Sequence, residues 1–283
     1  MKRILITGSG SYIGTSFMSW VSQWPEKYRV DVIDMKGIDW KDKTFETYDV
    51  IYHVAAIVHY KENDSDMYYK INRDLVIEVA KRAKAEGVKQ FIFISTMGVY
   101  GMETGYVNGD TKPNPKTPYA KSKHEAEKIL RELANDSFKV AILRPPIVYG
   151  KNCRGNYPRL AEMALKLPIF PKVNNERSML YIDNLSEFVR LVTDKELNGL
   201  FFPQNKEYVN TTELVLKIAK VHGKEIWVIG SFAPLLSMGM KISETFGKIF
   251  GSFTYEKRMP GGPCWDFDYE TCSFGESIER TEK

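Results

Sequence analysis

The chain has 283 residues, 43 % of them hydrophobic, so it can bury a full core in one large domain or in a large and a small one. Its 40 basic and 36 acidic residues give a net charge of +4 and are scattered singly, which argues against a nucleic-acid partner or a polybasic membrane anchor. No stretch approaches the ~18 uninterrupted apolar residues of a membrane span, and the first residues lack an apolar run of secretory length. The three cysteines form no CxxC pair, so we expect structural thiols, no metal site and a cytoplasmic location.

Short apolar strands alternate with helical patterns over the first 150 residues. Strands are predicted at residues 3–7, 28–34, 48–56, 89–96 and 138–144, and helical segments up to about 24, over 65–86 and from about 118. Nearly continuous apolar strands in this alternation predict an α/β fold with a parallel sheet covered on both faces. This is the doubly wound architecture.

The pattern changes after residue 150, where prolines become frequent. Short strands are predicted near 178–182 and 200–202, followed by a helix over about 211–222. We therefore expect residues 1–150 to form the doubly wound domain. Residues 151–283 would form mainly a smaller second lobe, with about 177–210 returning to the first domain.

A glycine-rich turn, TGSGSYIG at residues 7–14, joins the first strand to the first helix. Free N–H groups at such a helix N-terminus suit a pyrophosphate. Asp34 ends the next strand, where its carboxylate can accept hydrogen bonds from both hydroxyls of an adenosine ribose and would repel a 2′-phosphate. The two features together favour NAD over NADP; the alternative is a tight turn and a surface aspartate without a ligand.

A second motif, TPYAKSK at residues 117–123, begins a predicted helix. Thr117 can cap this helix and Pro118 can occupy its first position. Tyr119 and Lys123 share its apolar stripe, although a lysine is rarely buried without a partner. An ammonium beside the phenol would lower the tyrosine pKa from about 10 toward working pH, which makes Tyr119 a candidate general base and acid for interconverting a hydroxyl and a ketone. The alternative is a core tyrosine with a lysine that extends to solvent.

An ordered series of motifs resembles the extended short-chain dehydrogenase/reductase superfamily, specifically its NAD-dependent epimerase/dehydratase branch, which includes nucleotide-sugar 4-epimerases. The series covers most of the chain: TGSGSYIG (7–14), Asp34, IDW (38–40), HVAA (53–56), Asn72, FIFISTMGVYG (91–101), PYAKSK (118–123), LRPPIVYG (143–150) and RSMLYIDN (177–184). The resemblance implies a Rossmann domain that binds NAD, a substrate lobe, a nucleotide-sugar substrate and a homodimer.

The resemblance also implies roles for the matched positions. Thr96 would bind and orient the reacting oxygen beside Tyr119, and Lys123 would also hold the nicotinamide ribose. Arg177 would contact a substrate phosphate; the alternative is a surface arginine at a strand start. The implied cofactor contacts are Gly8, Ser11, Tyr12, Ile13, Gly14, Asp34, Asp39, Trp40, Ala55, Ala56, Ile57, Asn72, Tyr119 and Lys123, and the implied substrate contacts are Thr96, Tyr119 and Arg177.

Departures from the family pattern reduce the number of reactions that the chain is expected to catalyse. Met97 and Gly98 follow the threonine where the 4,6-dehydratases that the chain resembles have Asp-Glu, and neither residue can transfer a proton, so dehydration is not expected. Ser11 replaces the middle glycine of the turn beside Gly10, and we expect cofactor binding to survive with a shifted loop. Ile147 replaces an asparagine that contacts the substrate diphosphate in many of the epimerases, which leaves the nucleotide carrier open.

The sequence thus predicts an enzyme that interconverts C4 epimers of a nucleotide sugar through a transient 4-keto intermediate, with NAD bound, in polysaccharide or cell-envelope sugar metabolism. A keto-sugar reductase or related alcohol dehydrogenase with the same Thr96, Tyr119 and Lys123 is the alternative enzyme. A noncatalytic NAD-sensing or scaffold protein is the alternative from another class. Residues 232–254, rich in Gly, Met and Phe, are expected to pack in the second lobe or in a dimer contact rather than on a membrane surface, and no stable membrane insertion is expected.

Overall fold

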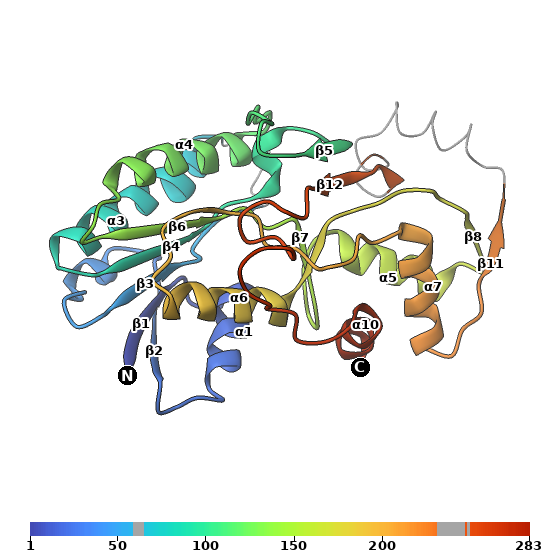
Figure 1. Ribbon diagram of the computed structural model, residues 1–283, viewed down its shortest axis with the longest axis horizontal. Coiled ribbons are helices and arrows are strands. Elements are labelled where there is room, and N and C mark those ends of the chain that lie inside the picture. Colours follow the sequence, from blue (N-terminus) through green and yellow to red (C-terminus); the bar gives the residue numbers. More distant parts are fainter. Residues whose placement is uncertain (59–64, 231–246, 248–249) are drawn as a thin grey trace. The chain divides into compact units, whose positions relative to one another are not determined.

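The computed structural model describes residues 1–58, 65–230, 247 and 250–283 (Figure 1). The chain divides into two compact units. Unit 1 comprises residues 1–101, 112–145 and 185–202, and unit 2 comprises 102–111, 146–184 and 203–283. The first unit therefore ends at residue 145, where the sequence suggested 150, and residues 185–202 belong to it, where the sequence suggested about 177–210.

Unit 1 is built on a six-stranded parallel sheet in the order β10-β6-β4-β3-β1-β2. Its strands are β1 (Lys2–Thr7), β2 (Tyr28–Ile33), β3 (Val50–His53), β4 (Gln90–Ile94), β6 (Lys139–Leu143) and β10 (Gly199–Phe201). Thr7, at the end of β1, is in register with Ile33 on one side and His53 on the other. The strand order reverses at β1, and in open α/β sheets ligands bind at the carboxyl ends of the strands beside such a switch point.

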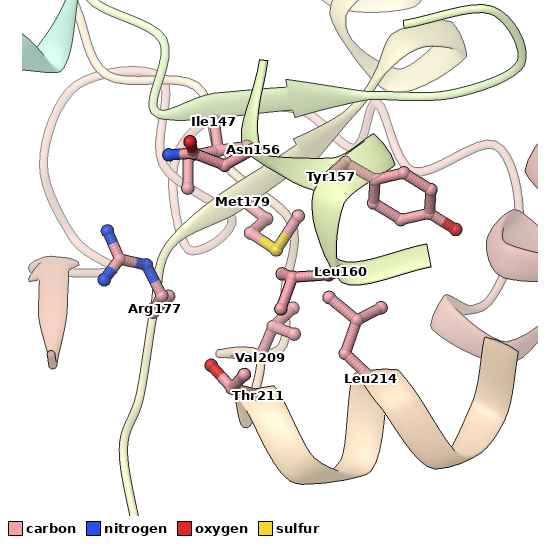
Figure 2. Close-up of a pocket in the computed structure, with 9 residues that line it drawn as sticks. All are labelled: Ile147, Asn156, Tyr157, Leu160, Arg177, Met179, Val209, Thr211 and Leu214. Atoms are coloured by element: carbon pink, nitrogen blue, oxygen red, sulfur yellow. The ribbon is translucent and has the colours of Figure 1, made fainter. Parts of the chain in front are cut away.

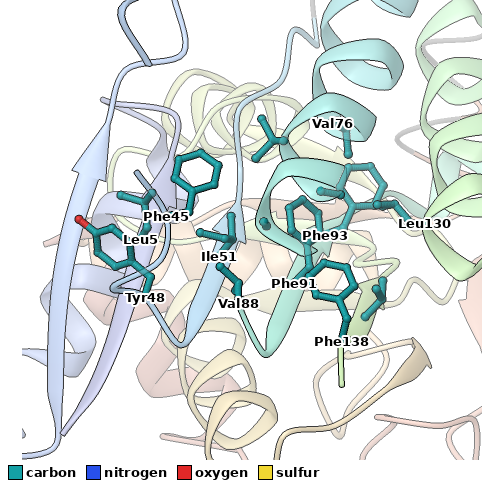
Figure 3. Close-up of a cluster of buried hydrophobic side chains, with 14 of the residues drawn as sticks. Leu5, Phe45, Tyr48, Ile51, Val76, Val88, Phe91, Phe93, Leu130 and Phe138 are labelled. Atoms are coloured by element: carbon teal, nitrogen blue, oxygen red, sulfur yellow. The ribbon is translucent and has the colours of Figure 1, made fainter. Parts of the chain in front are cut away.

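Helices cover both faces of this sheet, which confirms the doubly wound prediction. Figure 1 shows α3 (Leu75–Ala85) and α4 (Pro118–Leu133) on one face, and α1 (Tyr12–Val21) and α6 (Ile182–Asp194) on the other. Side chains from β1, β3, β4 and β6 meet those of α3 and α4 in a buried apolar cluster (Figure 3). Phe91, Phe93 and Phe138 are buried in it, and each contributes about 1.5–3 kcal/mol by leaving water.

The helix predicted over residues 65–86 has an interruption. It consists of α2 (Ser65–Tyr69), a π-helical turn (Lys70–Asp74) and α3. A π-helical turn inserts an extra residue into the helical ladder and is often found at functional sites. Here the turn contains the buried Asn72.

In the part of unit 2 that the structure describes, six strands form three two-stranded parallel sheets. These pair β5 (Gly105–Val107) with β12 (Phe253–Tyr255), β7 (Ile147–Tyr149) with β9 (Met179–Tyr181), and β8 (Ile169–Pro171) with β11 (Trp227–Ile229). The described part of unit 2 also contains the helices α5 (Asn156–Lys166), α7 (Thr211–Val221) and α10 (Phe274–Glu282). Of these elements the sequence predicted only β9 and α7.

No helix within the described part of the chain has the length and hydropathy required to cross a bilayer. The expectation for residues 232–254 concerns a segment of which 232–246 and 248–249 lie outside the described residues.

Candidate active site

The turn between β1 and α1 requires glycine at two positions for different reasons. Gly8 has φ +119°, and a Cβ there would lie 2.8 Å from the backbone nitrogen of Ala55. At Gly14 a Cβ would lie 3.0 Å from Cγ2 of Ile6, so this glycine lets α1 pack closely on the sheet. Both features are those of a turn that brings backbone N–H groups to a phosphate.

Ser11, in place of the middle glycine, is compatible with this turn. Its φ is −66°, which any residue adopts, and its hydroxyl accepts a hydrogen bond from the N–H of Gly14 at 3.4 Å as the N-cap of α1. The positive φ of +70° falls on Gly10. Ser11 therefore fits the turn, and no glycine is required at this position. Tyr12 and Ile13 follow as the first, partly buried residues of α1.

The residues expected around the adenosine differ in exposure. Asp34 directly follows β2, is exposed, and accepts a hydrogen bond from the N–H of Lys36 at 3.0 Å. Asp39 is exposed at the start of a 3₁₀ helix. Trp40, by contrast, is only 2 % exposed and belongs to the buried cluster of unit 1, with the Arg82 guanidinium 6.0 Å from its ring centre. Its packing leaves little side-chain surface for an adenine.

Asn72 fixes the loop that follows β3. Its amide oxygen accepts from the N–H of Ile57 at 2.9 Å, and its amide nitrogen donates to the carbonyl of Ile57 at 2.9 Å. The side chain is completely buried in the π-helical turn. Ala55, Ala56 and Ile57, the residues expected to line the cofactor, are therefore held at the carboxyl end of β3 by a side chain that both donates to and accepts from the same backbone residue.

Thr96 and Tyr119 come together at the end of β4. Thr117 caps α4 by accepting from the N–H of Ala120 at 3.2 Å, with Pro118 in the first position, as the sequence predicts. This places Tyr119 in the first turn of α4, where the Thr96 hydroxyl is close enough to lower the pKa of the phenol. The Thr96 hydroxyl also accepts from the N–H of Gly98 at 3.0 Å, which orients it.

Lys123 lies one turn further along α4 and is 2 % exposed. Its Nζ donates to the carbonyl of Ile94 at 2.8 Å and lies 4.6 Å from the ring centre of Phe93. Burial lowers the pKa of Lys123 to about 7, and the negative charge of Glu127 acts in the opposite direction. The alternative of a lysine extending to solvent is therefore wrong, because the ammonium is enclosed by β4 and α4.

The prediction that the pKa of Tyr119 is lowered is wrong when only the groups of the protein itself act on the phenol. Burial raises the pKa of Tyr119 to about 12, the hydrogen bond with Thr96 lowers it, and Tyr68 raises it. The Lys123 ammonium faces the carbonyl of Ile94 and itself has a lowered pKa, so it contributes little to phenolate formation. A further positive charge beside the phenol is required before Tyr119 can act as a base near neutral pH.

His53, within the HVAA motif, lies next to this group in the core. It is completely buried, and its Nδ1 lies 2.8 Å from the Thr7 hydroxyl. Burial, followed by the charge of Lys123, lowers the pKa of His53 to about 3. Among the described residues no hydrogen-bond partner contacts its Nε2. The imidazole is therefore neutral over the physiological range and does not carry protons to or from Tyr119.

Arg177 lies in unit 2 and is not a surface residue, because it is 8 % exposed. Its Nη1 donates to the carbonyls of Gly251 at 2.7 Å and Gly247 at 3.4 Å, and its Nε has no partner among the described residues. Burial lowers the pKa of Arg177 to about 10, and Glu103 raises it. A buried guanidinium whose hydrogen-bond acceptors here are backbone carbonyls keeps the capacity to bind an anion.

Arg177 lines a small pocket within unit 2 (Figure 2). Figure 2 shows its guanidinium and the amide of Asn156 on one side of the pocket, with Leu160 and Leu214 on the other. Ile147, where a diphosphate-binding asparagine was expected, is also part of the lining. The nitrogen-bearing side chains, Arg177 and Asn156, thus lie on one side of the pocket, whose lining also includes Tyr157 and Thr211.

One functional group was not predicted from the sequence. Glu127 is completely buried on α4 and hydrogen-bonds to Ser95 and Arg144, both of which are also buried. The signal was available, since Glu127 lies one helical turn after Lys123. The argument that singled out a lysine on a buried helix face applies equally to this glutamate.

These features agree with the comparisons with known proteins. The model of the NAD dependent epimerase/dehydratase family matches residues 4–201, and the chain belongs to this family. The predicted family is thereby confirmed, and with it NAD as the family's cofactor. The UDP-glucose 4-epimerase of Vibrio cholerae is 30 % identical over 92 % of this chain and 86 % of its own length. The N-acetyl-alpha-D-glucosaminyl-diphospho-ditrans,octacis-undecaprenol 4-epimerase of Escherichia coli O157:H7 is 25 % identical over 88 % and 81 %.

Solved structures share the fold. MoeE5 in complex with UDP-glucose and NAD aligns with a TM-score of 0.74 at 17 % identity, covering 99 % of this chain and 97 % of its own. The dTDP-4-dehydrorhamnose reductase of Bacillus anthracis in complex with NADP aligns with a TM-score of 0.72 at 21 % identity, covering 99 % and 98 %. Structures solved with NAD and with NADP therefore share this fold.

Proposed function

We propose that the protein is an NAD-dependent epimerase that interconverts C4 epimers of a nucleotide sugar through a transient 4-keto intermediate. The observation that carries the proposal is that Thr96 and Tyr119 lie together at the carboxyl end of a central strand, close enough for the Thr96 hydroxyl to lower the pKa of the phenol, with Lys123 buried one turn away on α4. The relationship to a UDP-glucose 4-epimerase over 92 % of the chain supports the choice of reaction.

The residues of unit 1 fit NAD. The turn from Gly8 to Gly14 offers the N-terminus of α1 to the pyrophosphate. Because Gly8 has no Cβ, this turn can pack directly against Ala55 in the loop after β3. Asp34, exposed at the end of β2, would accept hydrogen bonds from the adenosine ribose. NAD supplies a nicotinamide ring that is positively charged in its oxidised form and that accepts and returns a hydride.

Side chains of the protein would remove and return the proton of the C4 hydroxyl. Thr96 would hold the C4 oxygen of the sugar, and Tyr119 would take the proton from its hydroxyl and return it. Because burial raises the pKa of Tyr119 to about 12, the phenolate would form only when a positive charge, such as that of the oxidised nicotinamide ring, lies beside the phenol. Proton abstraction would therefore be restricted to the cofactor-bound protein.

A diphosphate-linked sugar is the substrate class that the site supports. Arg177 presents a buried guanidinium with an unpartnered Nε within the described residues, which suits a phosphate oxygen. Ile147 offers no side-chain hydrogen bond, so the arginine would act without the asparagine expected there. The two curated relatives are named for a UDP-linked and an undecaprenyl-diphosphate-linked sugar. We infer that the substrate is a nucleotide sugar, and the experiment below also includes a sugar linked to a polyprenyl diphosphate.

The experiment is product analysis without added cofactor. Purified protein is incubated with UDP-glucose, UDP-GlcNAc, dTDP- and GDP-hexoses and a polyprenyl-diphosphate-linked GlcNAc, and the C4 epimer is sought by chromatography and NMR. Tyr119→Phe should abolish the conversion, whereas Tyr106→Phe, at a 54 % exposed position, should leave it unchanged. No epimer from any of these sugars would contradict the proposal.

A reductase or dehydrogenase is the second candidate, favoured by the likeness to a dTDP-4-dehydrorhamnose reductase. It would consume one NAD(P)H for each keto-sugar reduced, so stoichiometric loss of absorbance at the wavelength of the reduced cofactor separates the two reactions. Dehydration is not proposed, because Met97 is buried and neither it nor Gly98 can transfer a proton. The proposal includes a cytoplasmic homodimer, which sedimentation and fractionation would test.

A further inference from the structure

We propose that Glu127 is a positioning residue, which fixes the Thr96 end of β4 against α4 and keeps the Lys123 side chain protonated. The expected effect on kcat rests on the proposed function, whereas the expected effects on the position of Thr96 and on the protonation of Lys123 do not. Glu127 contacts neither of the expected ligands; it acts through the residues around it. All of the groups involved belong to unit 1.

The carboxylate of Glu127 connects three separate chain segments. Its Oε1 accepts from the Ser95 hydroxyl and from Nε of Arg144, the latter at 2.9 Å. Its Oε2 accepts from Nη2 of Arg144, and Nδ1 of His124 lies 3.1 Å from it. Ser95 immediately precedes Thr96, and Arg144 immediately follows β6. The glutamate therefore ties α4 to the ends of two neighbouring strands.

Arg144 extends the connection to the turn after Thr96. Its remaining nitrogen, Nη1, donates to the Tyr100 hydroxyl at 2.9 Å, and Tyr100 ends the 3₁₀ helix that Thr96 caps. The segment that bears Thr96 is thus fixed on its N-terminal side by Ser95 and on its C-terminal side by Tyr100. The distance between the Thr96 hydroxyl and the phenol on α4 depends on this double attachment, because α4 carries both Glu127 and Tyr119.

The same carboxylate has an electrostatic effect on Lys123. Glu127 is one turn away on α4, where side chains are neighbours, and its side chain is completely buried, so water screens the pair poorly. Burial alone would raise the pKa of Glu127, but its hydrogen bonds with Arg144, His124 and Ser95 bring the pKa down to about 2. The group is therefore an anion at any pH at which the protein is folded and active.

Few other titratable or charged groups of the described residues lie near the pair. They are His53 on β3, Tyr119, His124 and Arg131 on α4, Tyr100 after β4, and Arg144 after β6. His53 is neutral, and the Arg131 guanidinium is 4.0 Å from Glu127 and half-exposed. Within the described residues Glu127 is thus the anion of this group, and removing its charge leaves the Lys123 ammonium beside only the carbonyl of Ile94 and the ring of Phe93.

The test is a direct titration of Lys123 in the whole protein. Lysine side-chain ¹⁵N NMR on labelled protein gives the pKa of each Nζ, and the Lys123 signal is assigned by its loss in Lys123→Met. We expect Glu127→Gln to lower the Lys123 pKa by about one to two units, the effect of a close opposite charge. Glu125→Gln is the matched control: it removes the same charge two residues from Lys123, where the carboxylate instead pairs with Arg73 at 2.8 Å, and should cause no shift.

The outcomes are separable from those of the epimerase assay, since the titration does not require turnover. An unchanged Lys123 pKa in folded Glu127→Gln overturns the proposal, as does an equal shift in Glu125→Gln. If Glu127→Gln does not fold, Ser95→Ala replaces it, because this variant keeps the charge and loses one attachment. It should lower kcat about threefold or more with the sugar KM and the Lys123 pKa unchanged, and an unchanged kcat would then overturn the proposal.

Discussion

The substitution Asn72→Asp tests how the loop after β3 is held, and the structure predicts a stability loss that depends on pH. Asn72 both donates to and accepts from Ile57, at 2.9 Å in each direction. An ionised aspartate can still accept from the N–H of Ile57, but its second oxygen would face the carbonyl oxygen of Ile57 with no proton between them. A protonated aspartic acid can donate that proton and so reproduce both hydrogen bonds.

The magnitude follows from burial. Asn72 is completely buried, and a carboxyl group at such a position has its pKa raised by about 2–3 units above the unfolded value near 3.9. Because the folded pKa is the higher one, the variant is close to the wild type below about pH 4 and loses about 1.4 kcal/mol of unfolding free energy for each pH unit between the two pKa values. The expected loss at pH 7.5 is therefore about 3–4 kcal/mol.

Urea unfolding of wild type and variant at pH 4 and at pH 7.5 measures this difference. Asn135→Asp is the matched control, because its hydrogen bonds with Ser137 and Phe138 all use the side-chain oxygen as acceptor, which an aspartate retains. The control should change stability by less than about 0.5 kcal/mol at either pH. If the loss in Asn72→Asp is the same at both pH values, the reciprocal pairing with Ile57 is not what holds the loop.

Three further predictions concern the turn, the phosphate and the core. Gly8→Ala should lower NAD affinity more than about tenfold by calorimetry and cost about 1–3 kcal/mol of stability, because its Cβ would meet the backbone of Ala55 at 2.8 Å. Gly10→Ala should cost less, because a Cβ there meets nothing within 4 Å. Equal effects of the two substitutions would contradict a steric cause. Arg177→Met should raise the KM for a sugar diphosphate about tenfold with a smaller change in kcat, and an unchanged KM would remove the phosphate role. Phe91→Ala, at 0 % exposure, should cost about 3–5 kcal/mol in urea unfolding, and a loss below about 1 kcal/mol would show that the cluster repacks freely.

Most of unit 1 could be predicted because its signals are local. Four of its first five strands contain a run of at least three apolar residues, and β2 alternates apolar and polar residues. The cap and proline at residues 117 and 118 mark the start of α4 at the observed residue. Unit 2 could be predicted only in part. Its sheets consist of three-residue strands paired across long sequence separations, and three residues are too few to show a periodicity.

The candidate site, too, could be predicted only in part from the sequence. The residue types and their order along the chain predicted which side chains belong to the glycine turn and to the Thr96, Tyr119 and Lys123 group. They did not predict the pKa values. The phenol is made less acidic by its surroundings and the lysine is directed to the carbonyl of Ile94, because desolvation and hydrogen bonding depend on neighbours supplied by other elements.

The sequence by itself therefore determined the main strands and helices of unit 1 in chain order, the family and the chemical groups available to the site. These follow from apolar periodicity, turn residues and spacing, which act over a few residues. Only the tertiary structure decided that Glu127 and Arg144 form a buried ion pair behind Thr96, and that Asn72 binds the backbone of Ile57. The physical reason is that a buried polar group must find its partner in space, and the partner is 15 residues away for Asn72 and 17 for Glu127.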